Sequence, residues 1–114
     1  MVKIQGIAPD MIANNLTPAY PTHPGEVIKD EIEYRGISQR KLAEQMGISY
    51  KALNDILNGR RAMTTATAMM LEAALDVPAD SLMRLQLKYN MQQAAHDKSF
   101  MERLNQIRKY AALL

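Results

Sequence analysis

A short stretch near the middle of the chain carries polar side chains at the spacing of one exposed helix face. They are Ser49, Tyr50, Lys51, Asn54 and Asp55, within the sequence SYKALND. A lysine donates to guanine O6 and N7, an amide pairs with adenine, and a carboxylate accepts from cytosine N4. We therefore expect these five residues to contact the edges of DNA bases. For Tyr50, a simple surface aromatic remains the alternative.

Four further polar residues flank this stretch and suit contacts with the phosphate backbone of DNA. Gln39 and Arg40 begin the preceding helical segment, where side chains and the first N–H groups reach a phosphate together. Arg60 and Arg61 follow the end of the second segment. We expect these four residues to contact the DNA backbone. The two arginines are alternatively solvated charges that favour the C-terminal end of the helix dipole.

Two short helices must position these side chains. Ser38 and Ser49 each stand where a side-chain oxygen caps a helix start, and Gly47 between them supplies a positive φ. Helices of about ten residues are marginal alone, so packing across the turn must hold them. Residues 38–58 therefore predict a helix-turn-helix, whose second helix lies in the DNA major groove. The residues expected to pack inward are Leu42, Ala43, Met46, Leu53, Ile56 and Leu57.

More helices are predicted on both sides of this pair. Pro24 suits a first helical position and Gly36 a helix end, with His23 as a helix-start residue. Pro78 opens a helix that continues toward Ala95. The residues expected to face inward are Ala66, Met70, Ala73 and Ala74 in the segment TTATAMMLEAAL, with Met69 also filling the core, and Leu82, Leu85 and Tyr89 after Pro78.

The chain is expected to divide into three parts. Residues 1–22 hold three prolines without sustained periodicity and are expected to form an N-terminal arm. Residues 23–97 are expected to form the DNA-binding domain, and residues 98–114 a C-terminal helix. Because a helix-turn-helix usually acts as a two-fold dimer, we expect an apolar seam on this last helix to contact a second copy or a partner; packing onto the same chain is the alternative. The seam comprises Phe100, Leu104, Ile107 and Ala111.

Composition and charge narrow the class of protein. The chain has 114 residues, 47% of them hydrophobic, which suits one folded domain. Its net charge is only +2, but residues 37–62 carry five basic against two acidic side chains. Such a local basic patch suits phosphate contact. Without cysteines, a membrane-length apolar run or an export signal, the expectation is a small soluble cytoplasmic protein with no membrane partner.

No enzyme activity, cofactor or metal site is expected. The only two histidines, His23 and His96, lie in separate segments, and no cysteine offers a thiolate ligand. The motifs HExxH and GxSxG, a phosphate-binding glycine loop and a calcium loop are absent.

The sequence SQRKLAEQMGIS followed by LNDILNGRR resembles the lambda-repressor-like, Cro/C1-type helix-turn-helix family. The flanking PTHPGEVIKDEIEYRGIS and NGRRAMTTATAMMLEAAL narrow this resemblance to HigA-type antitoxins of bacterial toxin–antitoxin modules. It covers roughly residues 20–90 and implies an all-α fold with a five-helix DNA-binding core. It also implies a homodimer on double-stranded operator DNA, an inverted repeat, with repression of its own operon. A small basic, RelE-like mRNA-cleaving toxin would be the protein partner. The long N-terminal arm of this chain is absent from shorter members of the family, so the resemblance implies no role for it.

Two other functions remain open beside the antitoxin. One is a free-standing helix-turn-helix transcriptional regulator without a toxin. The other is a protein-binding module that has lost DNA contact, against which Lys51, Arg60 and Arg61 argue. The surface for a toxin is also open between the N-terminal arm and the first helix, which is acidic. The acidic residues of that helix are Asp30, Glu31 and Glu33.

Overall fold

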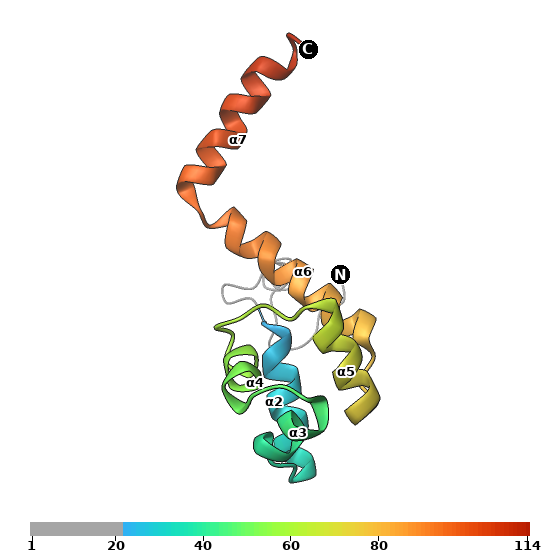
Figure 1. The fold of residues 1–114 in the computed structure, drawn as a ribbon. Coiled ribbons are helices and arrows are strands. Elements are labelled where there is room, and N and C mark those ends of the chain that lie inside the picture. The colour runs from blue at the N-terminus through green and yellow to red at the C-terminus, as the bar shows by residue number, and fades with distance from the viewer. Residues whose placement is uncertain (1–21) are drawn as a thin grey trace, which may run out of the picture.

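The computed structural model describes residues 22–114, whose regular elements are all helices (Figure 1). The expected all-α fold, with a five-helix lambda-repressor-like core and an additional C-terminal helix, is confirmed for these residues. The predicted N-terminal arm lies outside them except for Thr22. The helices are α2 (Pro24–Arg35), α3 (Gln39–Met46), α4 (Tyr50–Leu57), α5 (Thr65–Leu75), α6 (Ala79–Ala95) and α7 (Lys98–Ala111).

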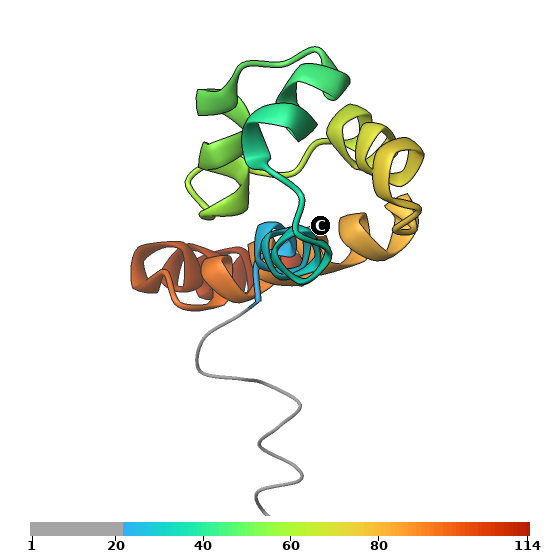
Figure 2. The ribbon, with the colours of Figure 1, turned by 90° about the horizontal axis from the view of Figure 1, so that it is seen from below.

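The hydrophobic core lies where α3, α4 and α5 form an arc over α2 and α6 (Figure 2). Ile28 on α2, Leu42 on α3 and Leu53 on α4 are fully or almost fully buried there, as are Leu71 on α5 and Leu82 on α6. Burying one such side chain contributes roughly 1.5–3 kcal/mol. Packing thus supplies the stability that the eight-residue helices α3 and α4 lack alone.

The predicted caps fix the ends of the two short helices. The Ser38 hydroxyl accepts a hydrogen bond from the Lys41 N–H at 3.1 Å, and the Ser49 hydroxyl accepts one from the Ala52 N–H at 3.0 Å. Gly47 adopts a φ of 71° between the helices, as expected for a left-handed helix cap. The sharp turn between α3 and α4 is therefore confirmed.

The first turn of α2 is fixed by His23 and Gly25. The Nδ1 atom of His23 accepts a hydrogen bond from the Gly25 N–H at 2.9 Å, which confirms His23 as a helix-start residue. The His23 ring also packs edge-on against Tyr89 of α6, with ring centroids 4.9 Å apart. A Cβ at Gly25 would overlap the carbonyl oxygen of Ile56, so a side chain there would push α2 away from α4.

Helix α5 faces the core with a different side from the one predicted. Its buried residues are Thr67, Ala68, Leu71 and Leu75. Of the predicted inward row, Ala66, Ala73 and Ala74 are exposed and Met70 is half-buried; Met69, expected in the core, is 60% exposed. The segment is apolar on nearly every side, so its pattern defines no single face. The two leucines four residues apart occupy the core because they bury more apolar area than the alanines.

Helix α6 runs to Ala95, as predicted, and its inward side is more polar than expected. Leu82 is buried, whereas Leu85 and Tyr89 are half-buried. Gln86 is buried instead, and its Oε1 accepts a hydrogen bond from the Met63 N–H at 2.7 Å. This bond ties the segment after α4 to α6.

Helix α7 leads away from the core (Figure 1). Asp97 caps its start, where the Asp97 carboxylate accepts a hydrogen bond from the Phe100 N–H at 3.1 Å. None of its residues is buried. Among the described residues, no helix combines the length and the apolar character needed to cross a membrane.

Candidate nucleic-acid interface

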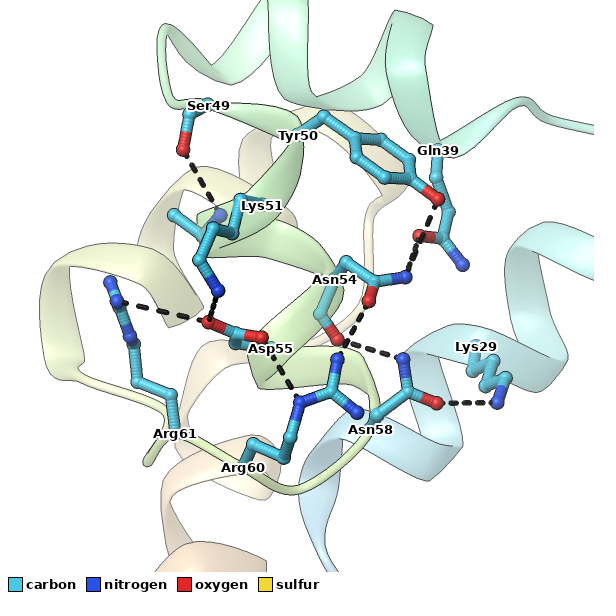
Figure 3. A network of polar contacts seen from close by, with 11 residues as sticks. Lys29, Gln39, Ser49, Tyr50, Lys51, Asn54, Asp55, Asn58, Arg60 and Arg61 are labelled. Carbon is cyan, nitrogen blue, oxygen red and sulfur yellow. Dashed lines mark hydrogen bonds and ion pairs between the residues drawn. The ribbon is translucent and has the colours of Figure 1, made fainter.

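One face of α4 gathers most of the residues that the sequence predicts for DNA. Tyr50, Lys51 and Asn54 lie on it together, with Ser49 at its start (Figure 3). The side chain of Lys51 is 82% exposed, and Tyr50 is 40% exposed. The Ser49 hydroxyl is engaged in the helix cap. Lys51 therefore has the greatest reach among these residues.

Asn54 stands at the centre of a polar network on this face (Figure 3). Its Nδ2 donates to Gln39 Oε1 at 3.0 Å and approaches the Tyr50 hydroxyl at 3.5 Å. Its Oδ1 accepts from Arg60 Nη2 at 2.8 Å. The network joins the start of α3, the middle of α4 and the segment after α4, so predicted base and backbone contacts are held in one arrangement.

Asp55 gathers the basic residues of the same surface. Its side chain is only 13% exposed, and its carboxylate lies 3.3 Å from Lys51 Nζ and 3.1 Å from Arg60 Nε. Arg61 Nη2 lies 3.9 Å away. The hydrogen bond from Arg60 is the main reason why the pKa of Asp55 lies below its ordinary value; the nearby Lys51 contributes as well. The Asp55 carboxylate, which the sequence predicts to contact a base, is thus already paired with cationic side chains of the protein.

Arg40 and Tyr50 come together although they lie on different helices. The guanidinium carbon of Arg40 lies 4.4 Å from the centroid of the Tyr50 ring, which is the geometry of a cation–π contact. This contact is worth roughly 0.5–1 kcal/mol at an exposed site. It holds a predicted backbone contact beside a predicted base contact.

Lys29 and Asn58 join the network but are missing from the residues predicted for DNA contact. Lys29 Nζ donates to Asn58 Oδ1 at 2.7 Å, and Asn58 Nδ2 donates to the Asn54 carbonyl at 2.9 Å. Lys29 belongs to the acidic helix α2, so only the packing of α2 against α4 brings it to this surface. The sequence carries no local signal for that approach.

The predicted apolar seam lies on α7, beyond α6 and away from the α4 face (Figure 1). Phe100 and Ile107 are 41% and 57% exposed, Leu104 is half-buried and Ala111 is exposed. A groove of about 400 Å³ lies along the end of α7, lined by Ile107, Tyr110 and Leu114 among others. The structure thus separates the seam from the residues predicted to contact DNA. Within residues 22–114, no three His, Cys, Asp or Glu side chains gather as a metal site would require.

Comparison with known proteins identifies the family of this chain. The helix-turn-helix family HTH_3 matches residues 28–82, which run from α2 to the start of α6. Virulence-associated protein I of Dichelobacter nodosus is 31% identical over 77 residues, which cover 67% of this chain and 71% of that protein.

Two solved structures from Pseudomonas aeruginosa are also similar. PA4674 in complex with its operator DNA is 33% identical, with a TM-score of 0.61, over 65% of this chain and 82% of that one. The antitoxin HigA with the higBA promoter is 30% identical, with a TM-score of 0.64, over 73% of this chain and 92% of that one. The chain therefore belongs to the Cro/C1-type helix-turn-helix family, within which it is similar to HigA-type antitoxins.

Proposed function

We propose that this protein binds operator DNA as a repressor of its own operon and neutralises a RelE-like mRNA-cleaving toxin. The observation that supports DNA binding most is the exposed α4 face, where Asn54 is held between Gln39 and Arg60. The similarity to PA4674 with its operator and to HigA with a promoter supports the same function.

In the proposed complex, α4 lies in the major groove and α3 crosses the DNA backbone. Lys51 donates to guanine and Asn54 pairs with adenine, since these side chains match those base edges. Gln39, Arg40 and Arg61 contact phosphates around the groove, which sets the register of α4 without reading sequence. This arrangement uses the side chains in the places where the network already holds them.

A homodimer is the proposed binding unit. One recognition helix reads only a few base pairs, and a second copy doubles the contacts across an inverted repeat. We propose that residues 98–114 supply the dimer or partner contact, residues 23–97 form the DNA-binding domain and residues 1–22 form an arm. The exposed side chains of Phe100 and Ile107 support this division, because apolar groups of that size gain from burial.

Toxin neutralisation requires only binding, with the toxin's RNA-binding surface covered. The acidic side of α2 is one proposed surface, because Asp30 and Glu33 are exposed there and would attract a basic ribonuclease. Glu31 is already paired with Arg35 at 2.6 Å. The N-terminal arm is the other proposed surface. A free-standing regulator of the same fold remains the second candidate, favoured if no toxin gene adjoins.

An electrophoretic shift with the DNA upstream of the gene, titrated with salt, tests the repressor function. We expect tight, salt-sensitive binding to an inverted repeat, because phosphate contacts release counterions. Binding no tighter than to random DNA would contradict autorepression and leave a protein-binding module. Co-purification with the product of an adjacent short reading frame, with loss of its ribonuclease activity, separates an antitoxin from a free-standing regulator.

A further inference from the structure

Asp55 is the acidic residue at the centre of a basic surface. Its Oδ1 accepts a hydrogen bond from Arg60 Nε at 3.1 Å, and its Oδ2 accepts one from Lys51 Nζ at 3.3 Å (Figure 3). The same Oδ2 lies 3.9 Å from Arg61 Nη2. With 13% of its side chain exposed, the carboxylate lies beneath the three cations, whose side chains are between 56% and 82% exposed.

The backbone of residue 55 holds the same segment a second time. The Asp55 carbonyl accepts hydrogen bonds from the Arg60 N–H at 2.8 Å and from the Arg61 N–H at 3.2 Å. The far end of the Arg60 guanidinium is fixed as well, since its Nη2 donates to Asn54 Oδ1. Both the path of the segment after α4 and the direction of the Arg60 side chain therefore depend on residues 54 and 55.

A carboxylate on a DNA-binding surface has an electrostatic cost. It repels phosphates on any DNA and so weakens binding that is independent of sequence. An arginine held at both ends loses less conformational freedom when it meets a phosphate in the correct place. A duplex that is not bound in the correct register gains nothing from the oriented arginine, yet its phosphates are still repelled by the carboxylate. The two effects act in the same direction, toward a larger difference between operator and random DNA.

We propose that Asp55 is a positioning residue that sets operator specificity by orienting Lys51, Arg60 and Arg61, and that it contacts no base itself. This inference depends on the proposed operator binding, and it replaces the base contact expected for Asp55 from the sequence. Asp55 is ionised at neutral pH, as an ordinary aspartate is, and its cationic partners lower its pKa further.

The test compares Asp55→Asn with Asp80→Asn, measuring dissociation constants for operator and for random DNA of equal length. Asp80 is a matched control: it pairs with Arg84 at 3.4 Å on α6, with 69% of its side chain exposed. We expect Asp55→Asn to lower the ratio of operator affinity to random-DNA affinity by about tenfold. A change of this size lies within the range of interaction energies found between contacting residues. Binding to random DNA should stay equal or tighten. Asp80→Asn should leave the ratio unchanged.

A double-mutant cycle with Arg60→Ala separates positioning from a general loss of structure. If Asp55 acts through Arg60, Asp55→Asn should lower the ratio much less in the Arg60→Ala background. An unchanged ratio for Asp55→Asn, or fully additive losses in the cycle, would overturn the proposal. If Asp55→Asn does not fold, as judged by circular dichroism, Asp55→Ala replaces it, because alanine also removes the carboxylate and suits a helix; an unchanged ratio there is equally decisive. Wild-type protein that does not distinguish operator from random DNA would instead contradict the proposed function.

Discussion

Lys51 and Arg61 both carry a positive charge to the proposed DNA surface, but we expect them to read different features of DNA. Lys51 projects from the middle of α4, with its side chain 82% exposed. Arg61 lies after the end of α4, where its side chain is 56% exposed. A cation on the recognition helix reaches base edges, whereas one beyond it reaches phosphates.

We predict that Lys51→Ala costs about 1–3 kcal/mol at the operator and relaxes the preference for guanine at one position in each half-site. The loss should be much smaller on random DNA, because a base contact contributes little there. Competition binding against operators with single base changes measures both effects. Equal losses on operator and random DNA would contradict a base contact for Lys51.

Arg61→Ala serves as the matched loss of one positive charge. We expect it to weaken binding to all DNA alike and to reduce the slope of log affinity against log salt by about one unit. Binding isotherms at four or more salt concentrations give this slope. If Arg61→Ala changes base preference while the slope stays constant, the roles of Arg61 and Lys51 are reversed.

For single residues, the sequence predicts which side chains share a helix face better than it predicts their hydrogen-bond partners. The spacing of Tyr50, Lys51 and Asn54 predicts one exposed face, and the structure places them on one face. The bond of Lys29 to Asn58 spans 29 residues and depends on how α2 packs on α4. Local spacing carries no information on such an approach, so this part of the network could not be predicted.

The contact between α2 and α4 depends on Gly25, because a Cβ there would overlap the Ile56 carbonyl oxygen. We predict that Gly25→Ala lowers the free energy of unfolding by about 3 kcal/mol, since backbone cannot yield as a flexible side chain does. Gly36→Ala is the control: nothing lies within 4 Å of its Cβ position, and its φ of 70° costs only about 1 kcal/mol. Urea unfolding measures both. A loss no larger for Gly25→Ala than for Gly36→Ala would show that α2 can move away from α4.

His23 links the start of α2 to pH. Burial lowers the pKa of His23, while a hydrogen bond with the Arg61 backbone and the charge of Glu26 oppose this shift. The free side chain in the unfolded chain titrates near its ordinary pKa of about 6.5. The unfolded state therefore binds a proton at His23 more readily than the folded state does. The contribution of neutral His23 to the free energy of unfolding is complete above about pH 6.5 and is lost as the pH falls below that value. Protonation of Nδ1 also removes the acceptor for the Gly25 N–H.

We predict that the free energy of unfolding falls between pH 7.5 and pH 5.5, and that His23→Asn reduces this fall. Asparagine still caps the helix start but does not titrate, so the other acidic and basic groups cancel in the comparison. Chemical unfolding at a series of pH values gives both curves. Parallel curves for the two proteins would assign the pH dependence to other groups.

At the scale of elements, the bounds of helices with clear cap and turn residues could be predicted from the sequence. The buried side of a helix that is apolar all round could not. Ser38, Gly47 and Ser49 each have a unique local function, and the structure confirms all three. The orientation of α5 was predicted incorrectly because alanine and methionine surround Leu71 and Leu75 on nearly every side. Which side of an evenly apolar helix is buried depends on the shape of its neighbours, and that shape follows only from tertiary packing.

Across residues 22–114, a five-helix core continues into one helix, α7, none of whose residues is fully buried. Helix α7 has 14 residues, close to the length at which an isolated helix is marginal in water. Its N-terminal cap at Asp97 contributes about 1 kcal/mol. Internal pairs, such as Arg108 with Asn105 at 3.0 Å, contribute only about 0.2–0.5 kcal/mol each. Burial of its apolar seam against a second copy would add the stabilisation that α7 lacks.

We predict that truncation after residue 97 yields a monomer in multi-angle light scattering, whereas the full chain is a dimer. Ile107→Asp should have the same effect while keeping α7, because it places a charge in the seam. Asn105→Asp adds the same charge on the opposite side of α7 and should remain dimeric. The monomeric variants should bind a single half-site as the full chain does, but lose the added affinity for the inverted repeat. An intact dimer after truncation would place the interface on the core, and α7 would then be the better candidate for contact with a different protein.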